Sequence, residues 1–242
     1  MLVLNTINRI RNIGNKAKML VFDMAGTTVN ENGIIYHTIY DTLKMLNFDV
    51  YKDDMPTWYG RSKSEILLHY LNKKHNNFNG YEVHQNNNVF EQELIWTFKR
   101  NLKNNYFNQG NIKLMDKDMP DLFNRLRDND IKITLNTGYD SDIQQTIIDS
   151  LKMDEFVDDY VSSSDVFNGR PYPDMINLLM KRNEISNPNR IIKFGDTKND
   201  ILEGNNAKCF LSVGVLTGAE NEEGLSKSDC ILNSVMDIKY VI

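Results

Sequence analysis

One acidic residue, Asp23, follows a short apolar segment and precedes a loop of small residues. The residues before it (19–22) are Met-Leu-Val-Phe, and those after it (24–28) are Met-Ala-Gly-Thr-Thr. Ligands of open α/β sheets bind at the carboxyl ends of the strands, so a strand ending here would place Asp23 in a site as a nucleophile. Gly26, Thr27 and Thr28 would let backbone amides approach an anion. Capping of a helix or turn is the alternative for any single aspartate.

Two further acids, Asp196 and Asp200, follow the apolar segment 191–194 at the expected start of a helix. Acids four residues apart on a helix can face one pocket. Magnesium prefers oxygen ligands and is often held by one or two carboxylates together with phosphate oxygens of a substrate. Asp196 and Asp23 therefore predict a magnesium site. Asp200 either supports its ligands or is a helix-terminus acid favoured by the helix dipole.

Phosphate contacts are expected from two other places in the chain. Thr137 and Gly138 follow the apolar segment 131–135, so their hydroxyl and amide groups could hold phosphate oxygens, although a plain turn gives the same pattern. Arg170 stands before a proline-rich turn and could neutralise the charges of a phosphoryl group and of Asp23. A surface arginine is the alternative for this residue.

Composition limits the classes of partner. The chain has 242 residues, a net charge of -5 and scattered lysines, so no basic face for nucleic acid is expected. No segment approaches the roughly 20 apolar residues that span a bilayer. Cys209 and Cys230 lie in or beside apolar segments and are expected to be reduced, which favours a cytoplasmic protein. Residues 1–17 are predicted to add a short helix or strand to the core, not a targeting signal.

The chain is predicted to contain a helical insert at residues 34–111. Apolar residues recur at helical spacing in 34–48, 64–71 and 89–102, while asparagine-rich loops are expected at 86–88 and 104–111. The rest of the chain alternates strands and helices, which is typical of a parallel sheet. The expected elements are helices from 119, over 143–151 and over 174–182, and strands at 131–135, 160–162, 191–194 and 209–215, the last being the final clear strand.

The predicted fold class is therefore α/β: a Rossmann-like, doubly wound parallel sheet core with an inserted α-helical cap domain. Residues 1–33 and 112–242 would form the core and residues 34–111 the cap.

The motifs resemble those of the haloacid dehalogenase-like (HAD) superfamily. Its phosphotransferases open with an Asp-x-Asp-x-Thr-like loop whose first Asp takes up the phosphoryl group, which implies that role for Asp23. Here Ala25 replaces the second acid, and Asp-x-Ala-Gly-Thr-Thr is the form found in the phosphonoacetaldehyde hydrolase (phosphonatase) branch. The Gly-Arg-Pro-x-Pro sequence around Arg170 is also similar to that branch. The resemblance further implies that the backbone carbonyl of Ala25 joins Asp23 and Asp196 around Mg²⁺, with Asp200 in support.

The insert residue Lys63 would decide the substrate class. In phosphonatases a cap lysine at the end of a Gly-x-x-Lys stretch forms a Schiff base with the substrate aldehyde, and Lys63 follows Gly60 at that spacing. The phosphonatase cap also has a histidine three residues after its lysine, where this chain has Ile66. Two interpretations of Lys63 therefore stay open, a Schiff-base lysine and a lysine that contacts phosphate or solvent.

The chemistry of the leaving group links Lys63 to Ala25. A phosphate ester benefits from a general acid, which Ala25 cannot supply, whereas cleavage of a carbon–phosphorus bond needs an electron sink such as an iminium. Our leading hypothesis is a magnesium-dependent phosphonatase-like hydrolase that forms an aspartyl-phosphate and acts on a small phosphonate aldehyde. A phosphate monoesterase of the same fold is the alternative, and a non-catalytic phosphate-binding or interaction protein is a third. A small phosphonate or phosphate ester is the expected partner, and a homodimer through the cap is a further expectation.

Overall fold

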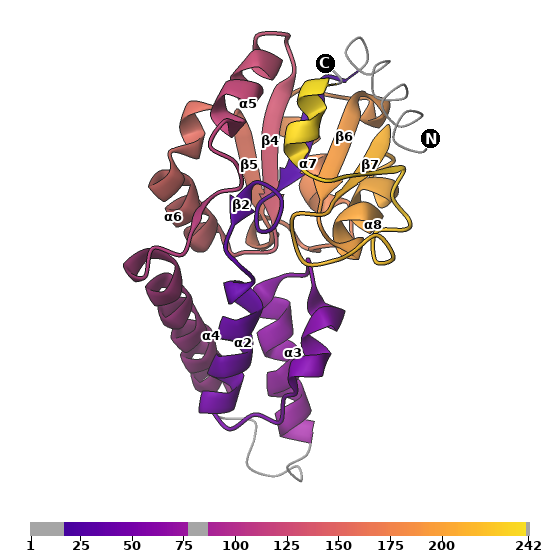
Figure 1. Ribbon diagram of the computed structural model, residues 1–242. Coiled ribbons are helices and arrows are strands. Elements are labelled where there is room, and N and C mark those ends of the chain that lie inside the picture. Colours follow the sequence, from indigo (N-terminus) through magenta and orange to yellow (C-terminus); the bar gives the residue numbers. More distant parts are fainter. Residues whose placement is uncertain (1–16, 77–86, 241–242) are drawn as a thin grey trace.

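The computed structural model describes residues 17–76 and 87–240. Its centre is a six-stranded sheet in which every neighbouring pair of strands is parallel, in the order β5-β4-β1-β6-β7-β8 (Figure 1). The strands are β1 (Met19–Asp23), β4 (Lys132–Thr137), β5 (Asp159–Ser162), β6 (Ile191–Gly195), β7 (Leu211–Val215) and β8 (Cys230–Leu232). A separate antiparallel ribbon joins β2 (Val29–Asn30) to β3 (Lys113–Leu114). The predicted addition at residues 1–17 lies, except for Ala17, outside the described residues.

The central strand β1 explains why Asp23 lies at a sheet edge. All five of its residues are buried, as expected of a strand with sheet neighbours on both sides and helices on both faces. Successive side chains point to opposite faces, so Leu20 and Phe22 join one apolar cluster while Met19 and Val21 join another. The sheet is therefore covered on both sides, and the predicted doubly wound α/β fold is confirmed.

Four helices cover the sheet: α5 (Met119–Arg127), α6 (Ser141–Leu151), α7 (Asp174–Arg182) and α8 (Lys198–Asn206). Each has one apolar face; in α5 this face comprises Met119, Leu122, Phe123 and Leu126, at the spacing of three and four residues that places side chains on one side of a helix. Short 3-10 turns occur at Met153–Glu155, Ser163–Asp165, Pro188–Arg190 and Val235–Tyr240.

The predicted helical insert contains α2 (Ile34–Met45), α3 (Lys63–Asn76) and α4 (Asn87–Lys103), with a 3-10 segment at Lys52–Trp58. These helices lie together beyond the strand ends (Figure 1). A single apolar cluster nevertheless runs from Phe22 in the sheet to Ile35 and Leu94 in the helices. The division of the chain into domains at 33/34 and 111/112 stays a prediction.

Three details differ from the sequence prediction. The predicted loop 104–111 begins with a π-helical turn at Asn104–Asn108, because the buried Tyr106 side chain anchors it to the rest of the molecule. The predicted loop 86–88 already contains the first turn of α4, although residue 86 lies outside the described residues. The segment 209–215 is not the last strand, because β8 pairs with β7 at the sheet edge. A strand of three residues is too short for its pattern to stand out in the sequence.

Phe22 is expected to contribute strongly to stability, because its ring stacks on Phe123 at 4.8 Å and on Phe194 at 4.7 Å. Replacing it in Phe22→Ala should lower the free energy of unfolding by about 3–5 kcal/mol, as for other buried aromatic residues. Chemical denaturation of the two proteins measures the difference.

Phe167 provides the control, because it is 98% exposed. Phe167→Ala should change the free energy of unfolding by less than about 0.5 kcal/mol. Equal losses in the two variants would contradict the stacking of the three aromatic rings.

Candidate active site

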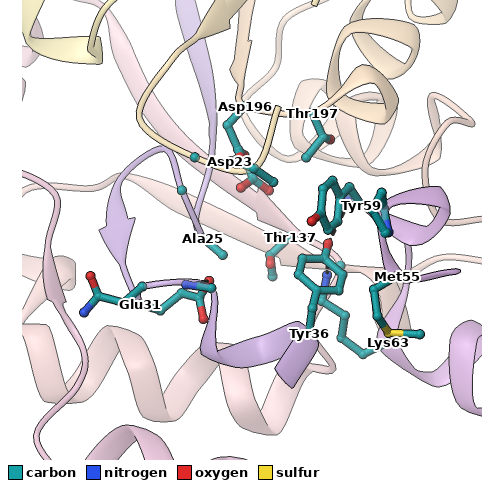
Figure 2. A pocket seen from close by; sticks show the side chains of 18 of the residues that line it. Asp23, Ala25, Glu31, Tyr36, Met55, Tyr59, Lys63, Thr137, Asp196 and Thr197 are labelled. Atoms are coloured by element: carbon teal, nitrogen blue, oxygen red, sulfur yellow. Dashed lines mark hydrogen bonds between the residues drawn. The ribbon is translucent and has the colours of Figure 1, made fainter. Parts of the chain in front are cut away.

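A cavity of about 520 Å³ opens at the carboxyl ends of the strands, between the sheet and the helical insert (Figure 2). Among the sequence-predicted site residues, it is lined by Asp23, Ala25, Lys63, Thr137, Gly138, Arg170 and Asp196. Two other predicted residues lie behind this lining. Thr27 is buried and its hydroxyl donates to Asp196 Oδ1 at 3.3 Å, and Asp200 is completely buried beneath Arg170.

The loop after β1 turns back on itself directly beyond Asp23. The backbone N–H groups of Thr27, Thr28 and Val29 all donate to the carbonyl oxygen of Met24. Gly26 adopts a φ of 82°, and a Cβ there would overlap the Asp196 carboxylate. Glycine at this position therefore lets the loop carrying Asp23 approach Asp196 closely.

Arg170 joins Asp23 to the interior of the molecule. Its Nη1 lies 2.6 Å from Asp23 Oδ1 and 3.2 Å from Asp200 Oδ1, and its Nε lies 2.9 Å from Glu203 Oε2. Its Nη2 donates to Asn136 Oδ1 at 2.6 Å. Burial opposes its charge, but the three carboxylates outweigh that effect and raise the pKa of Arg170 well above its usual value. Arg170 is thus a fixed cation beside Asp23 and not a surface residue.

Sequence reasoning missed the residues that complete this buried charge cluster, Lys193 and Glu203. Lys193 Nζ lies 2.9 Å from Asp200 Oδ1 and 3.5 Å from Glu203 Oε2, and it donates to Asn136 Oδ1 at 2.7 Å. The Asn136 amide donates to both oxygens of Glu203 at 2.9 Å. A lysine inside the otherwise apolar segment 191–194 was the signal available in the sequence, because a fully buried lysine requires a partner.

The pKa values of the three acids in the site are shifted in different directions. Burial raises the pKa of Asp23 to about 6, although Arg170 opposes the shift. Burial, followed by the charges of Asp23 and Asp200, raises the pKa of Asp196 well above its usual value. Burial also disfavours the charge of Asp200, but Arg170 and Lys193 outweigh it and lower the pKa of this carboxyl.

These residues fit a divalent cation. Oxygen atoms of Asp23, Asp196 and Asp200 lie within 4.8 Å of one another. Together with Glu203 they are four acids close to the two cations Arg170 and Lys193, so the acids of this cluster outnumber the cations by two. A hard divalent cation between Asp23 and Asp196 would relieve their repulsion, since carboxylate oxygens are its preferred ligands. Asp200 is held by Arg170 and Lys193, and therefore supports this site from behind.

The position of Asp196 is set by its neighbours. The Ala219 N–H donates to Asp196 Oδ2 at 2.7 Å, opposite the Thr27 hydroxyl on Oδ1. A Cβ at Gly218 would overlap this carboxylate. Ala25 also lines the cavity, and its backbone carbonyl as a metal ligand stays a prediction.

Lys63 enters the cavity from the first position of α3. Its backbone N–H donates to the carbonyl of Gly138 at 2.9 Å, which ties the insert to the loop after β4. Its Nζ donates to the carbonyl of Arg61 at 3.1 Å and lies 5.1 Å from the centre of the Tyr36 ring and 5.5 Å from that of Tyr139. Lys63 is therefore brought to the same cavity as Asp23.

Burial lowers the pKa of the Lys63 amine from its usual 10.5 to about 8. Asp23, Glu31 and Asp196 oppose this shift, while Arg170 adds to it. At neutral pH roughly one tenth of such amines are uncharged, against about one in 3,000 for a lysine of pKa 10.5. The cavity thus makes Lys63 a better nucleophile than an exposed lysine.

Two more cavity residues, Tyr36 and Glu31, were not among the predicted site residues. The Tyr36 hydroxyl accepts from the Gly60 N–H at 2.8 Å and lies 3.5 Å from Lys63 Nζ. The Glu31 carboxylate accepts from the Ile35 N–H at 2.8 Å and from the Tyr106 hydroxyl at 3.1 Å. Their spacing from Asp23 follows no pattern that indicates a site, because the turn after β1 and the start of α2 bring them back to it.

The family model for haloacid dehalogenase-like hydrolases matches residues 20–213. That range covers most of the chain, including β1, the helical insert and β6, so the protein belongs to this hydrolase family.

Several curated relatives are named phosphonoacetaldehyde hydrolase. A phosphonoacetaldehyde hydrolase of Parabacteroides distasonis is 38% identical over 105 residues, which are 43% of this chain and 39% of that protein. The match thus spans well under half the length of this curated relative.

Solved structures share the fold at low sequence identity. A phosphonoacetaldehyde hydrolase-like protein from Oleispira antarctica aligns with a TM-score of 0.74 and 21% identity, covering 93% of this chain and 91% of that one. A predicted phosphoglycolate phosphatase from Haemophilus somnus aligns with a TM-score of 0.68 and 20% identity, covering 92% and 96%. These likenesses support the α/β fold.

Among residues 17–76 and 87–240, no helix combines the length and the apolar character needed to cross a bilayer.

Lys193 is expected to stabilise the protein by neutralising Asp200 and Glu203. Lys193→Met should lower the free energy of unfolding by about 3–5 kcal/mol, because removing one partner leaves buried charge uncompensated. The double variant Lys193→Met/Glu203→Gln should recover part of this loss. Chemical denaturation measures both.

The matched control is Lys181→Met on the exposed side of α7, which should change stability by less than about 0.5 kcal/mol. A double variant less stable than Lys193→Met would show that Lys193 and Glu203 do not share the buried charge.

Proposed function

We propose that this protein is a magnesium-dependent hydrolase that cleaves the carbon–phosphorus bond of a small phosphonate aldehyde, such as phosphonoacetaldehyde, through an aspartyl-phosphate. The observation that carries the proposal is Lys63: a buried amine with a lowered pKa that lines the same cavity as Asp23. Family membership and the relatives named phosphonoacetaldehyde hydrolase support it.

The proposed steps divide between the two halves of the cavity. Lys63 adds to the aldehyde carbon and, after loss of water, forms an iminium. Asp23 attacks phosphorus, and the electron pair of the carbon–phosphorus bond moves into the iminium to give an enamine. Thr137, Gly138 and Arg170 would hold the phosphoryl oxygens. One water molecule then hydrolyses the aspartyl-phosphate to Asp23 and phosphate. The enamine takes up a proton at carbon, and a second water molecule hydrolyses the resulting iminium to acetaldehyde and the free Lys63 amine. Ala25 fits this route, because the electron pair is taken up by the iminium and no loop acid is required.

Mg²⁺ would be held by Asp23, Asp196 and the Ala25 carbonyl. When bound, it would offset the negative charge of the phosphoryl group and of the two carboxylates. Arg170 would orient Asp23 toward phosphorus through its 2.6 Å contact.

Iminium formation at Lys63 should depend on pH in a defined direction. The uncharged amine is the nucleophile, so the rate should rise about tenfold for each pH unit below about 8 and level off above about 9. Trapping with cyanoborohydride and phosphonoacetaldehyde between pH 6 and 10, followed by peptide mass spectrometry, measures this rate.

Label on the exposed Lys181 serves as the reference in the same digest, and Lys63→Met should abolish the site label and the release of phosphate and acetaldehyde. No label at Lys63 together with no acetaldehyde would overturn the proposed function. A midpoint near 10.5 would show that the amine is not desolvated in solution.

Magnesium should stabilise the protein through Asp196. A ligand at 100 times its dissociation constant adds about 2.7 kcal/mol, so the melting temperature should rise with Mg²⁺. Asp196→Asn should remove this rise, yet without metal it should be at least as stable as the wild type, because the substitution removes repulsion with Asp23 and Asp200.

Glu222→Gln changes an exposed acid and should keep the full magnesium response. Calorimetric titration with Mg²⁺ gives the affinities directly. An Asp196→Asn protein that still binds Mg²⁺ as tightly as the wild type would place the metal elsewhere.

A phosphate monoesterase is the second candidate. The cavity of about 520 Å³ is larger than a two-carbon phosphonate requires, and one structural neighbour is a predicted phosphoglycolate phosphatase. Phosphate release from esters that survives Lys63→Ala would favour this candidate over carbon–phosphorus cleavage.

A further inference from the structure

Tyr36 lies beside Lys63 in the cavity. It comes from α2, and Figure 2 shows its hydroxyl directed toward the part of the cavity that holds Thr137 and Asp23, with the Lys63 side chain beside it. The negative charges of Asp196 and Asp23 both act on this hydroxyl, which agrees with that placement.

The hydrogen bonds of Tyr36 leave its own proton free. A tyrosine hydroxyl can accept two hydrogen bonds and donate one. Its oxygen accepts from the Gly60 N–H at 2.8 Å and faces Lys63 Nζ at 3.5 Å. Over residues 17–76 and 87–240, no protein acceptor receives the Tyr36 O–H. A donor without a protein partner in a cavity is therefore available to an oxygen atom of a ligand.

The environment also keeps this donor protonated. Burial, followed by the charges of Asp196 and Asp23, raises the pKa of Tyr36 well above 10. The phenol therefore does not ionise over the range in which Lys63 gains its nucleophilic form.

We propose that Tyr36 is a catalytic residue that relays protons from Lys63 to the carbonyl oxygen of the substrate. This inference rests on the proposed function, because it assigns the proton transfers that the Lys63 iminium requires.

Lys63, Tyr36 and one proton from bulk solvent close the proton balance. As the lysine nitrogen bonds to carbon, it gives one proton to the Tyr36 oxygen while Tyr36 gives its own to the former carbonyl oxygen, which yields a carbinolamine. A second transfer by the same route converts the hydroxyl into water, the carbon–oxygen bond breaks, and the nitrogen electron pair forms a neutral imine. The uncharged amine has then passed its two protons to the oxygen, which has left as water, and Tyr36 again carries one proton. One proton from bulk solvent converts the imine into the iminium.

The geometry allows the relay to tighten when a substrate binds. The 3.5 Å between Lys63 Nζ and the Tyr36 oxygen is long for a hydrogen bond, but catalytic hydrogen bonds often shorten only in the complex. The Gly60 N–H holds the phenol oxygen from the insert loop, and Gly60 itself has a φ of 76° and packs against Thr197 of the core. Tyr36 is thus fixed between the insert and the core.

Tyr36→Phe tests the relay, because it keeps the ring and removes the proton. With phosphonoacetaldehyde and cyanoborohydride, we expect the plateau rate of labelling at Lys63 to fall at least tenfold, with a parallel fall in acetaldehyde release. Tyr36→Gln, which keeps an oxygen acceptor for Gly60 but has no acidic proton, should show the same loss. The control Tyr70→Phe removes a hydroxyl from a buried tyrosine of α3, whose oxygen lies 3.5 Å from Asp54 Oδ2. Its plateau rate of labelling at Lys63 should stay within about twofold of the wild-type rate.

The pH profile separates this role from a purely structural one. If the variant only displaced Lys63 into water, the midpoint of its labelling profile would move toward 10.5; loss of the relay lowers the plateau and leaves the midpoint near 8. Labelling of Tyr36→Phe at the wild-type rate, in a preparation whose wild type is labelled and releases acetaldehyde, overturns the relay alone. A wild type that is neither labelled nor active overturns the proposed function.

Discussion

The contact between Arg170 and Asp23 is the interaction on which the rest of the site depends. Both side chains are buried, and an isolated buried charge is strongly disfavoured. Arg170 is tolerated because Asp23, Asp200 and Glu203 surround it, and these acids are tolerated because Arg170 and Lys193 lie among them. This mutual requirement joins β1, β6, α8 and the turn before α7 around one point. The Asp23 carboxylate is thereby held in one orientation by the protein itself.

The helical insert completes the site through its backbone as much as through its side chains. The Lys63 N–H reaches the carbonyl of Gly138, the Asn199 amide reaches the carbonyl of Tyr59 at 2.6 Å, and Gly60 lies against Thr197. These contacts set the loop 59–63 over the ends of β4 and β6. The amine of Lys63 is desolvated because the loop is seated there, so the chemistry assigned to the amine depends on the position of the insert. A second set of hydrogen bonds connects both ends of the insert to the core. The Tyr106 hydroxyl donates to the Glu31 carboxylate and lies 2.6 Å from the Tyr139 hydroxyl.

Sequence reasoning predicted the elements whose pattern is local. The apolar segment before Asp23, the helix 174–182 and the strand ends carrying Thr137 and Asp196 all follow from spacing and from strand ends meeting at one sheet edge. It was wrong where a distant contact decides the conformation. The asparagine-rich segment 104–111 begins as a helical turn because Tyr106 is anchored by Tyr139 and Glu31, and β8 forms because β7 offers an open edge.

The sequence by itself determined which residues are available for the chemistry. These are an acid at a strand end, an alanine two residues later, a pair of acids four residues apart and a lysine in the insert (Asp23, Ala25, Asp196 with Asp200, and Lys63). Their order along parallel strands also determined that most of them meet. Only the tertiary structure decided how each group behaves, since pKa and orientation depend on burial and on charges distant in the chain. Arg170 is buried and held in place by its ion pairs with Asp200 and Glu203. Burial in the cavity removes water from the Lys63 amine and lowers its pKa. Tyr36 and Glu31 are part of the site because the chain folds back over Asp23. No local sequence pattern predicts this contact.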